Sequence, residues 1–250
     1  MSPLTRRVLG LIGAAAAGAC LAGCASTQTS PPIAASVVAP PPPPNGPVEP
    51  AGPAEAVAVQ GGDFYGSTKD GAFSVPAVKP GQVDSAFYRK NVAYSTKEAP
   101  GTIVVDPAKH YLYYVEEGGR ATRYGIGVGR EGFAWTGEAT IKSKQEWPDW
   151  YPPKEMIERR PDLKSQLVEL QSGIGMHGGP GNPLGARAMY LWQGDRDTLF
   201  RIHGTNEPWT IGKSQSSGCI RMINQDAMDL YQKAAVGTRV VVLPANIARR

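Results

Sequence analysis

Residues 202–222 read IHGTNEPWTIGKSQSSGCIRM, and this stretch is the most informative part of the chain. The residues just before it have the apolar and aromatic character of a strand that ends at His203. Residues just after it repeat apolar side chains at helical spacing, starting near Asn224, which we predict to be the N-cap. The sequence therefore predicts that a strand carries His203 into a loop, and that this loop carries Cys219 to the start of a helix.

The strand pattern continues on both sides of this stretch. Short segments rich in β-branched and aromatic residues are separated by Gly-rich turns, at 102–106, 111–116, 120–128, 138–147, 189–193, 199–203 and 238–243. The segment 147–182 has the length of a lid-like insertion and holds one short helix at 153–160. We predict a mostly β domain over 101–243, either a β-sandwich or a mixed sheet, with one helix after Cys219 and a tail over 244–250.

The N-terminus has the features of an exported leader. Two arginines precede a short apolar run over 8–22, which is typical of a secretory signal and too short for a comfortable permanent membrane span. The run ends in Leu21-Ala22-Gly23-Cys24, which resembles the lipobox of bacterial lipoproteins. We predict a signal peptide over 1–23 and lipidation of Cys24. A plain signal peptide and a twin-arginine signal are the alternatives.

The segment after Cys24 has the composition of a spacer. Residues 31–53 hold ten of the 23 prolines, so we predict an extended linker over 24–60 and a mixed N-terminal extension over 61–100. The formal net charge of +4 becomes +2 without the leader, because two basic and no acidic residues lie in 1–23. This charge is too small to predict nucleic-acid binding. Contact with a membrane is expected through the N-terminal lipid.

Cysteine usage points to Cys219 as a reactive thiol. The chain has three cysteines, of which Cys20 leaves with the leader and Cys24 would carry lipid. Cys219 is then left without a partner in an oxidising compartment, where structural cysteines are normally paired. An inert buried thiol is the alternative interpretation.

The residues around Cys219 fit acyl transfer by a thiol. Such chemistry needs a base, a group that orients the imidazole and N–H groups aimed at the oxyanion. His203 is the candidate base, and Gly218 leaves the main chain around Cys219 uncrowded for an oxyanion site. Arg221 is placed to hold a substrate carboxylate through a charge-assisted fork.

This motif resembles that of the L,D-transpeptidase (YkuD-type) family, a His-Gly followed by Ser-X-Gly-Cys-X-Arg. The match covers His203-Gly204 and residues 216–221, and the segments 101–113 and 179–191 also resemble the family. The resemblance implies Cys219 as nucleophile, His203 as base and the Gly204 carbonyl as the group that orients the imidazole. It also assigns Arg221, Gly218, Ser217 and Ser216 to substrate binding and the oxyanion site. Many family members have His at the position of Ser217, so the role of that side chain differs between members.

The resemblance further implies a reaction and a location. Cys219 would form a thioester with a peptidoglycan tetrapeptide stem and release D-alanine, without a cofactor. The acceptor would be the amine of another stem, giving a 3→3 cross-link, or a lysine of a wall-anchored lipoprotein. Water as acceptor would make the protein an L,D-carboxypeptidase. The expected location is the periplasm, anchored by lipid in the inner leaflet of the outer membrane, because Ala25 replaces the Asp that often retains lipoproteins at the inner membrane.

Other classes of protein fit the sequence less well. The three histidines and Cys219 lack close metal-ligand spacing, so no metal is expected. A papain-like peptidase would place Cys before His, which is the reverse of the order here. A non-catalytic wall-binding lipoprotein has no use for an unpaired thiol beside His and Arg. We expect a depressed Cys219 pKa that depends on His203 in the enzyme, and an inert thiol in the binding module.

Overall fold

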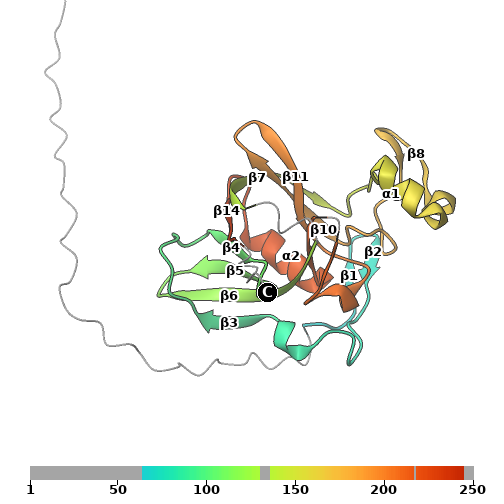
Figure 1. The fold of residues 1–250 in the computed structure, drawn as a ribbon. Helices are drawn as coiled ribbons and strands as arrows, with labels where there is room; N and C mark the ends of the chain where they lie inside the picture. The colour runs from blue at the N-terminus through green and yellow to red at the C-terminus, as the bar shows by residue number, and fades with distance from the viewer. Residues whose placement is uncertain (1–63, 130–135, 217, 245–250) are drawn as a thin grey trace, which may run out of the picture. The chain divides into compact units, whose positions relative to one another are not determined.

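The computed structural model describes residues 64–129, 136–216 and 218–244 (Figure 1). These residues belong to one compact unit by their contacts. The predicted leader, Cys24, the proline-rich linker, most of the tail and Ser217 lie outside the described residues.

Eight strands of the described residues close into a ring. Starting and ending at β6, the pairing order is β6-β13-β11-β10-β7-β14-β4-β5-β6. The strands are β4 (Ile103–Asp106), β5 (Tyr111–Glu116), β6 (Arg120–Gly129), β7 (Gly137–Glu146), β10 (Arg187–Gln193), β11 (Arg196–His203), β13 (Ile220–Met222) and β14 (Arg239–Val242). The β11–β13 and β14–β4 pairs are parallel and the other pairs antiparallel, so the mixed-sheet form of the predicted mostly β fold is confirmed.

The core joins the ring to one helix. Apolar side chains from all eight ring strands and from α2 (Asn224–Lys233) form one buried cluster, which includes Leu112, Ile141, Leu191, Ile202 and Leu230. The predicted helix after Cys219 is therefore confirmed, and burial of its apolar face holds it against the strands. No helix among the described residues is long and apolar enough to cross a membrane.

The start of α2 differs from the prediction. Ile223 occupies the N-cap position and makes no side-chain cap bond, while Asn224 is the first helical residue. The Asn224 amide accepts hydrogen bonds from the N–H groups of Ala186 (3.0 Å) and Thr205 (3.1 Å), and it donates to the Thr205 carbonyl (2.9 Å). This amide connects two loops instead of capping a helix, because those buried main-chain groups would otherwise lack partners.

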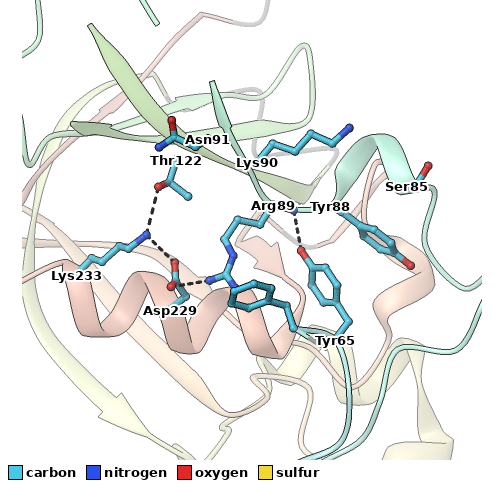
Figure 2. Close-up of a pocket in the computed structure, with 10 residues that line it drawn as sticks. Tyr65, Ser85, Tyr88, Arg89, Lys90, Asn91, Thr122, Asp229 and Lys233 are labelled. Atoms are coloured by element: carbon cyan, nitrogen blue, oxygen red, sulfur yellow. Dashed lines mark hydrogen bonds and ion pairs between the residues drawn. The ribbon is translucent and has the colours of Figure 1, made fainter. Parts of the chain in front are cut away.

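The N-terminal extension packs against the same unit. Within it lie β1 (Thr68–Asp70), β2 (Phe73–Val75), η1 (Ser85–Phe87) and β3 (Lys90–Ala93), and β3 pairs with β6. Asp70 accepts hydrogen bonds from both terminal nitrogens of Arg187 (2.6 and 2.9 Å) and from the Trp147 indole N–H (2.7 Å). A second polar contact joins Arg89 to Asp229 of α2 at 2.6 Å, which Figure 2 shows beside Lys233.

The predicted insertion forms a small substructure of its own. It contains α1 (Lys154–Arg159), η3 (Pro161–Gln166) and the hairpin of β8 (Val168–Leu170) and β9 (Gly173–Gly175), and the short predicted helix is confirmed. Figure 1 shows α1 and β8 beside each other and apart from the strands of the ring. The buried Asn182 side chain donates to the carbonyls of Pro148 (3.0 Å) and His177 (3.0 Å), so it connects the two ends of the insertion.

Candidate active site

Strand register places the predicted catalytic residues on one face of the sheet. In the parallel β11–β13 pair, Ile202 lies opposite Ile220 and His203 lies opposite Arg221. Both isoleucines are buried in the core cluster, so His203 and Arg221 project from the other face. Continuing the register by one residue puts Cys219 on the face of His203, diagonally across two neighbouring strands.

The imidazole of His203 is held in one tautomer. Its Nδ1 lies 2.5 Å from the Gly204 carbonyl, and since a carbonyl can only accept, Nδ1 carries the proton. Nε2 is then the basic nitrogen of the neutral ring. Burial, with the nearby charge of Arg221, lowers the pKa of His203 to about 4, against the opposing effect of the Gly204 and Leu184 main chain. The ring is therefore neutral at pH 7 and able to accept a proton.

Gly204 is fixed by contacts that require a glycine. A Cβ at this position would overlap the Oδ1 atom of Asn224, which is occupied by its own hydrogen bonds. The Gly204 N–H donates to the Arg187 carbonyl at 2.9 Å. These contacts hold in place the Gly204 carbonyl that accepts the hydrogen bond of His203.

Cys219 is a free, half-buried thiol. Its Sγ contacts the Leu199 carbonyl at 3.9 Å, and no hydrogen bond joins it to His203 among the described residues. Burial raises the pKa of the Cys219 thiol, with smaller opposing effects from Arg201 and Arg221. The depressed pKa expected from the sequence is therefore not what this geometry gives. The thiol and the imidazole are therefore both neutral at rest, instead of forming an ion pair.

The loop before Cys219 is held by Ser216. Its hydroxyl donates to the Cys219 carbonyl (2.6 Å) and accepts the Gly218 N–H (3.3 Å). Gly218 has φ +122°, a conformation that residues with a side chain rarely adopt. Ser216 thus supports the loop, and the Gly218 N–H, an expected oxyanion donor, is already used inside it. Ser217 lies outside the described residues.

Arg221 forms an ion pair within the chain. Its Nη1 donates to Glu207 at 2.9 Å and lies 3.4 Å from the Thr210 hydroxyl. A carboxylate therefore already occupies part of the fork that the sequence assigned to a substrate carboxylate. Sequence reasoning missed Glu207. The available signal was an acid in the segment between His203 and Cys219.

Residues outside the motif contribute less to this site. His177 is exposed and lies 3.8 Å from Asp149, while the half-buried His110 contacts the Ser214 hydroxyl at 3.1 Å. The described residues contain no group of three or more side chains suited to hold a metal ion. A cavity of about 360 Å³ lies elsewhere, beside Tyr65, Arg89 and Lys233 (Figure 2), and none of the motif residues lines it.

A comparison with protein families decides the family of this site. Residues 100–242 match the model of the YkuD family, described as the L,D-transpeptidase catalytic domain. The chain belongs to the YkuD family. The match spans more than half of the chain and includes every predicted site residue from His203 to Arg221.

Curated relatives of this YkuD-family chain carry L,D-transpeptidase names. It is 32% identical over 148 residues to the "Probable L,D-transpeptidase ErfK/SrfK" of Escherichia coli, covering 56% of this chain and 43% of that protein. It is 40% identical over 108 residues to a "Putative L,D-transpeptidase" of Fuscovulum blasticum, covering 43% and 49%. The chain thus spans less than half the length of these relatives.

A solved structure is also similar to the YkuD-family chain. A Brucella melitensis protein described as a "Probable carnitine operon oxidoreductase caia" is 55% identical, with a TM-score of 0.43 and coverage of 64% of this chain and 96% of that one. An L,D-transpeptidase from Mycobacterium smegmatis is 19% identical, with a TM-score of 0.40 and coverage of 57% and 58%.

Proposed function

We propose that this protein is a peptidoglycan L,D-transpeptidase in which Cys219 is the nucleophile and His203 the general base. The observation that carries the proposal is the shared sheet face of Cys219, His203 and Arg221, combined with the Nδ1 bond from His203 to Gly204. This hydrogen bond leaves Nε2 as the basic nitrogen of the neutral ring. Family membership supports the same assignment.

The first half of the reaction forms a thioester. As the Cys219 sulfur attacks the carbonyl of the third stem residue, a diamino acid, its proton moves to His203 Nε2. The tetrahedral adduct then breaks its bond to the terminal D-alanine, whose amine takes that proton. The neutral resting pair suits this order of events, because charge separation occurs only as the carbon–sulfur bond forms. Hydrogen bonds at such sites often tighten only once substrate is bound, which fits the 3.9 Å contact of Sγ with Leu199.

The second half of the reaction transfers the acyl group. An amine attacks the thioester, His203 takes its proton, and the sulfur leaves and recovers a proton from His203. The amine belongs to another stem, giving a 3→3 cross-link, or to a lysine of a wall-anchored lipoprotein. Water as the acceptor would give an L,D-carboxypeptidase.

The oxyanion and the substrate carboxylate need separate partners. Because Gly218 donates its N–H to Ser216, the Cys219 N–H is the better candidate for the oxyanion donor. Arg221 would bind a substrate carboxylate in one of two ways. Its guanidinium would either bind the substrate and Glu207 together, or release Glu207 when the substrate carboxylate binds. Ser216 and Ser217 would support this loop.

Defined muropeptides test the proposal. The full chain is incubated with disaccharide-tetrapeptides, and the products are weighed by mass spectrometry. Loss of alanine together with dimer formation is expected for a transpeptidase, and loss of alanine alone would identify a carboxypeptidase.

Two substitutions connect the reaction to the site. Cys219→Ala should abolish alanine release, and His203→Ala should reduce it by about 10²-fold or more. His177→Ala is the matched control, because His177 is exposed and stands outside the motif. Alanine release by Cys219→Ala at the rate of the parent protein would end the proposed mechanism.

We also propose that the protein is exported and lipid-anchored at Cys24, in the inner leaflet of the outer membrane. The lipobox-like Leu21-Ala22-Gly23-Cys24 supports this location, and the peptidoglycan substrate is consistent with it. Mass spectrometry of the mature N-terminal peptide should show an acylated Cys24, and Cys24→Ala should release the protein from the membrane fraction. An unmodified Cys24 in the mature protein would refute the anchor.

A further inference from the structure

Strand β11 carries a bulge next to the candidate nucleophile. Trp192 of β10 pairs with Asp197, and Tyr190 pairs with Arg201, so the three residues 198–200 lie opposite the single residue 191. Bulges of this kind redirect main-chain groups and are common beside active sites. This one supplies the Leu199 carbonyl that contacts Cys219 Sγ.

Asp197 holds the bulge together. Its carboxylate accepts the Leu199 N–H at 2.9 Å and both terminal nitrogens of Arg201 at 2.7 and 2.8 Å. This bidentate pair spans the bulge from one end to the other, and such forks fix geometry as well as charge. Thr198 adds a second set of bonds, donating to the Leu191 carbonyl (2.6 Å) and accepting the Phe200 N–H (3.1 Å).

The conformation of Leu199 shows that the bulge is imposed by these bonds. Leu199 has φ +62°, a left-handed conformation that leucine disfavours, and its side chain is 76% exposed. Packing of the side chain therefore does not explain the conformation. Strained residues persist where surrounding contacts over-determine them, and they concentrate at functional sites.

Two main-chain groups of the bulge reach the sulfur. The Leu199 carbonyl lies 3.9 Å from Sγ, and the main-chain N–H of Arg201 also interacts with it. A carbonyl can accept the thiol proton, and an N–H can donate to the sulfur once that proton has left. The bulge thus offers one contact for each protonation state of Cys219.

We propose that the Asp197–Arg201 pair is a positioning device for the nucleophile, which holds the β11 bulge so that Leu199 and Arg201 fix the Cys219 sulfur relative to His203. The inference rests on the proposed function, because it assigns the sulfur a reaction to be positioned for. Asp197 and Arg201 are positioning residues, and the position of the sulfur depends on them through the main chain of the bulge.

A double-mutant cycle on alanine release tests the pair. We expect Asp197→Asn and Arg201→Gln each to lower kcat at least tenfold, with KM within about threefold, since small misplacements of a reacting atom can cost about 10²-fold. The double variant should be no worse than the poorer single variant, because the two side chains act as one unit. Asp162→Asn is the control, because Asp162 accepts a similar fork from Arg160 on an exposed surface, and its kcat should stay at the parent value.

Alkylation of Cys219 by iodoacetamide separates positioning from loss of structure. A sulfur released from the bulge should react faster with this small probe, so the plateau rate at high pH should rise at least twofold in Asp197→Asn while kcat falls. Thr198→Val, which is nearly isosteric, removes the second set of bonds and should change both quantities in the same directions. It keeps the test available if Asp197→Asn does not fold.

The opposing results are distinct. A kcat within twofold of the parent value in Asp197→Asn and Thr198→Val would overturn the positioning role. A joint fall of kcat, alkylation rate and melting temperature would also overturn it, because that pattern indicates general loosening. Failure of the proposed function would instead appear as alanine release by Cys219→Ala, which the alkylation measurement does not involve.

Discussion

His203 and Asp226 are buried, and their protonation between pH 7 and pH 4 has opposite effects on the stability of the fold. The pKa of His203 is lowered from 6.5 to about 4, chiefly by burial. The pKa of Asp226 is raised from 3.8 to about 7, also chiefly by burial, against the nearby charge of Arg89. As the pH falls from 7 to 4, the unfolded chain protonates its histidine while the folded chain does not, so the His203 contribution destabilises the fold. Over the same range the folded chain protonates Asp226 before the unfolded chain does, so this contribution stabilises the fold.

Removing one of the two groups should expose the effect of the other. In Asp226→Asn, the free energy of unfolding should fall by about 3 kcal/mol more than in the parent between pH 7 and pH 4, since each pKa unit corresponds to about 1.4 kcal/mol. In His203→Gln, the free energy of unfolding should change in the opposite sense relative to the parent protein over the same pH range. Urea denaturation at a series of pH values measures both, and parallel curves for the variants and the parent protein would contradict the assignment.

At the scale of elements, β6 connects the ring to the loop that carries Cys219. It pairs with β5, β13 and β3, and its end also pairs in parallel with β12 (Ser214–Ser216). Gly129, the last residue of β6, lies so close to this loop that a Cβ would overlap the main chain of Gly218. The spacing of β6 and β12 therefore limits where the loop that carries Cys219 can lie.

Gly129→Ala should displace that loop. Because the overlapping atoms belong to the main chain, the loop has to move, and we expect alanine release to fall at least tenfold. Gly181→Ala is the control, since a Cβ there meets nothing within 4 Å. Alanine release by Gly129→Ala that equals the release by Gly181→Ala would show that the loop tolerates the shift.

The fork between Asp70 and Arg187 ties the N-terminal extension to β10. Arg187 is 5% exposed, so Asp70→Ala would leave a buried charge without its main partner. We expect a loss of about 3–5 kcal/mol in the free energy of unfolding. Asp162→Ala removes a comparable fork from an exposed position and should cost much less. Equal losses in the two variants, measured by urea denaturation, would show that burial of Arg187 does not matter.

At the scale of the whole molecule, the insertion should open independently of the ring. Asn182 is 1% exposed and joins the ends of the insertion through its amide, so Asn182→Ala leaves several buried carbonyls with fewer partners. We expect hydrogen exchange to accelerate about tenfold or more in residues 148–184 and to stay unchanged in the ring strands. Acceleration spread evenly over the ring would show that the two parts are one cooperative unit.

Much of this architecture could be predicted from local patterns. Seven ring strands and α2 carry enough apolar periodicity to be located, and the motif from His203 to Arg221 indicated a candidate site. β13 could not be found in this way, because the three residues of Ile220–Met222 are too few to show a period. The bulge at Leu199 depends on pairing with β10, which a single strand does not reveal. The polar pair Asp197-Thr198 was its one local signal, since such side chains often bond to nearby main chain.

The burial of the thiol also could not be read from the motif. The residue types around Cys219 suggested an ionised sulfur, but its protonation depends on how deeply the loop packs, which is a property of the assembled fold. The ion pair between Arg221 and Glu207 could not be predicted from the motif either, because the sequence between them has no periodicity that indicates which residues meet. The expected leader, linker and lipid anchor stay predictions.

The parallel pair of β14 with β4 joins the last strand of the ring to the first. A chain that emerges from the ribosome N-terminus first has to wait for Val240–Val242 before Ile103–Val105 gain this partner. Until then β4 and β7 both keep an open edge, and the circle of strands is incomplete. The ring would therefore close only after Val240–Val242 have become free to pair.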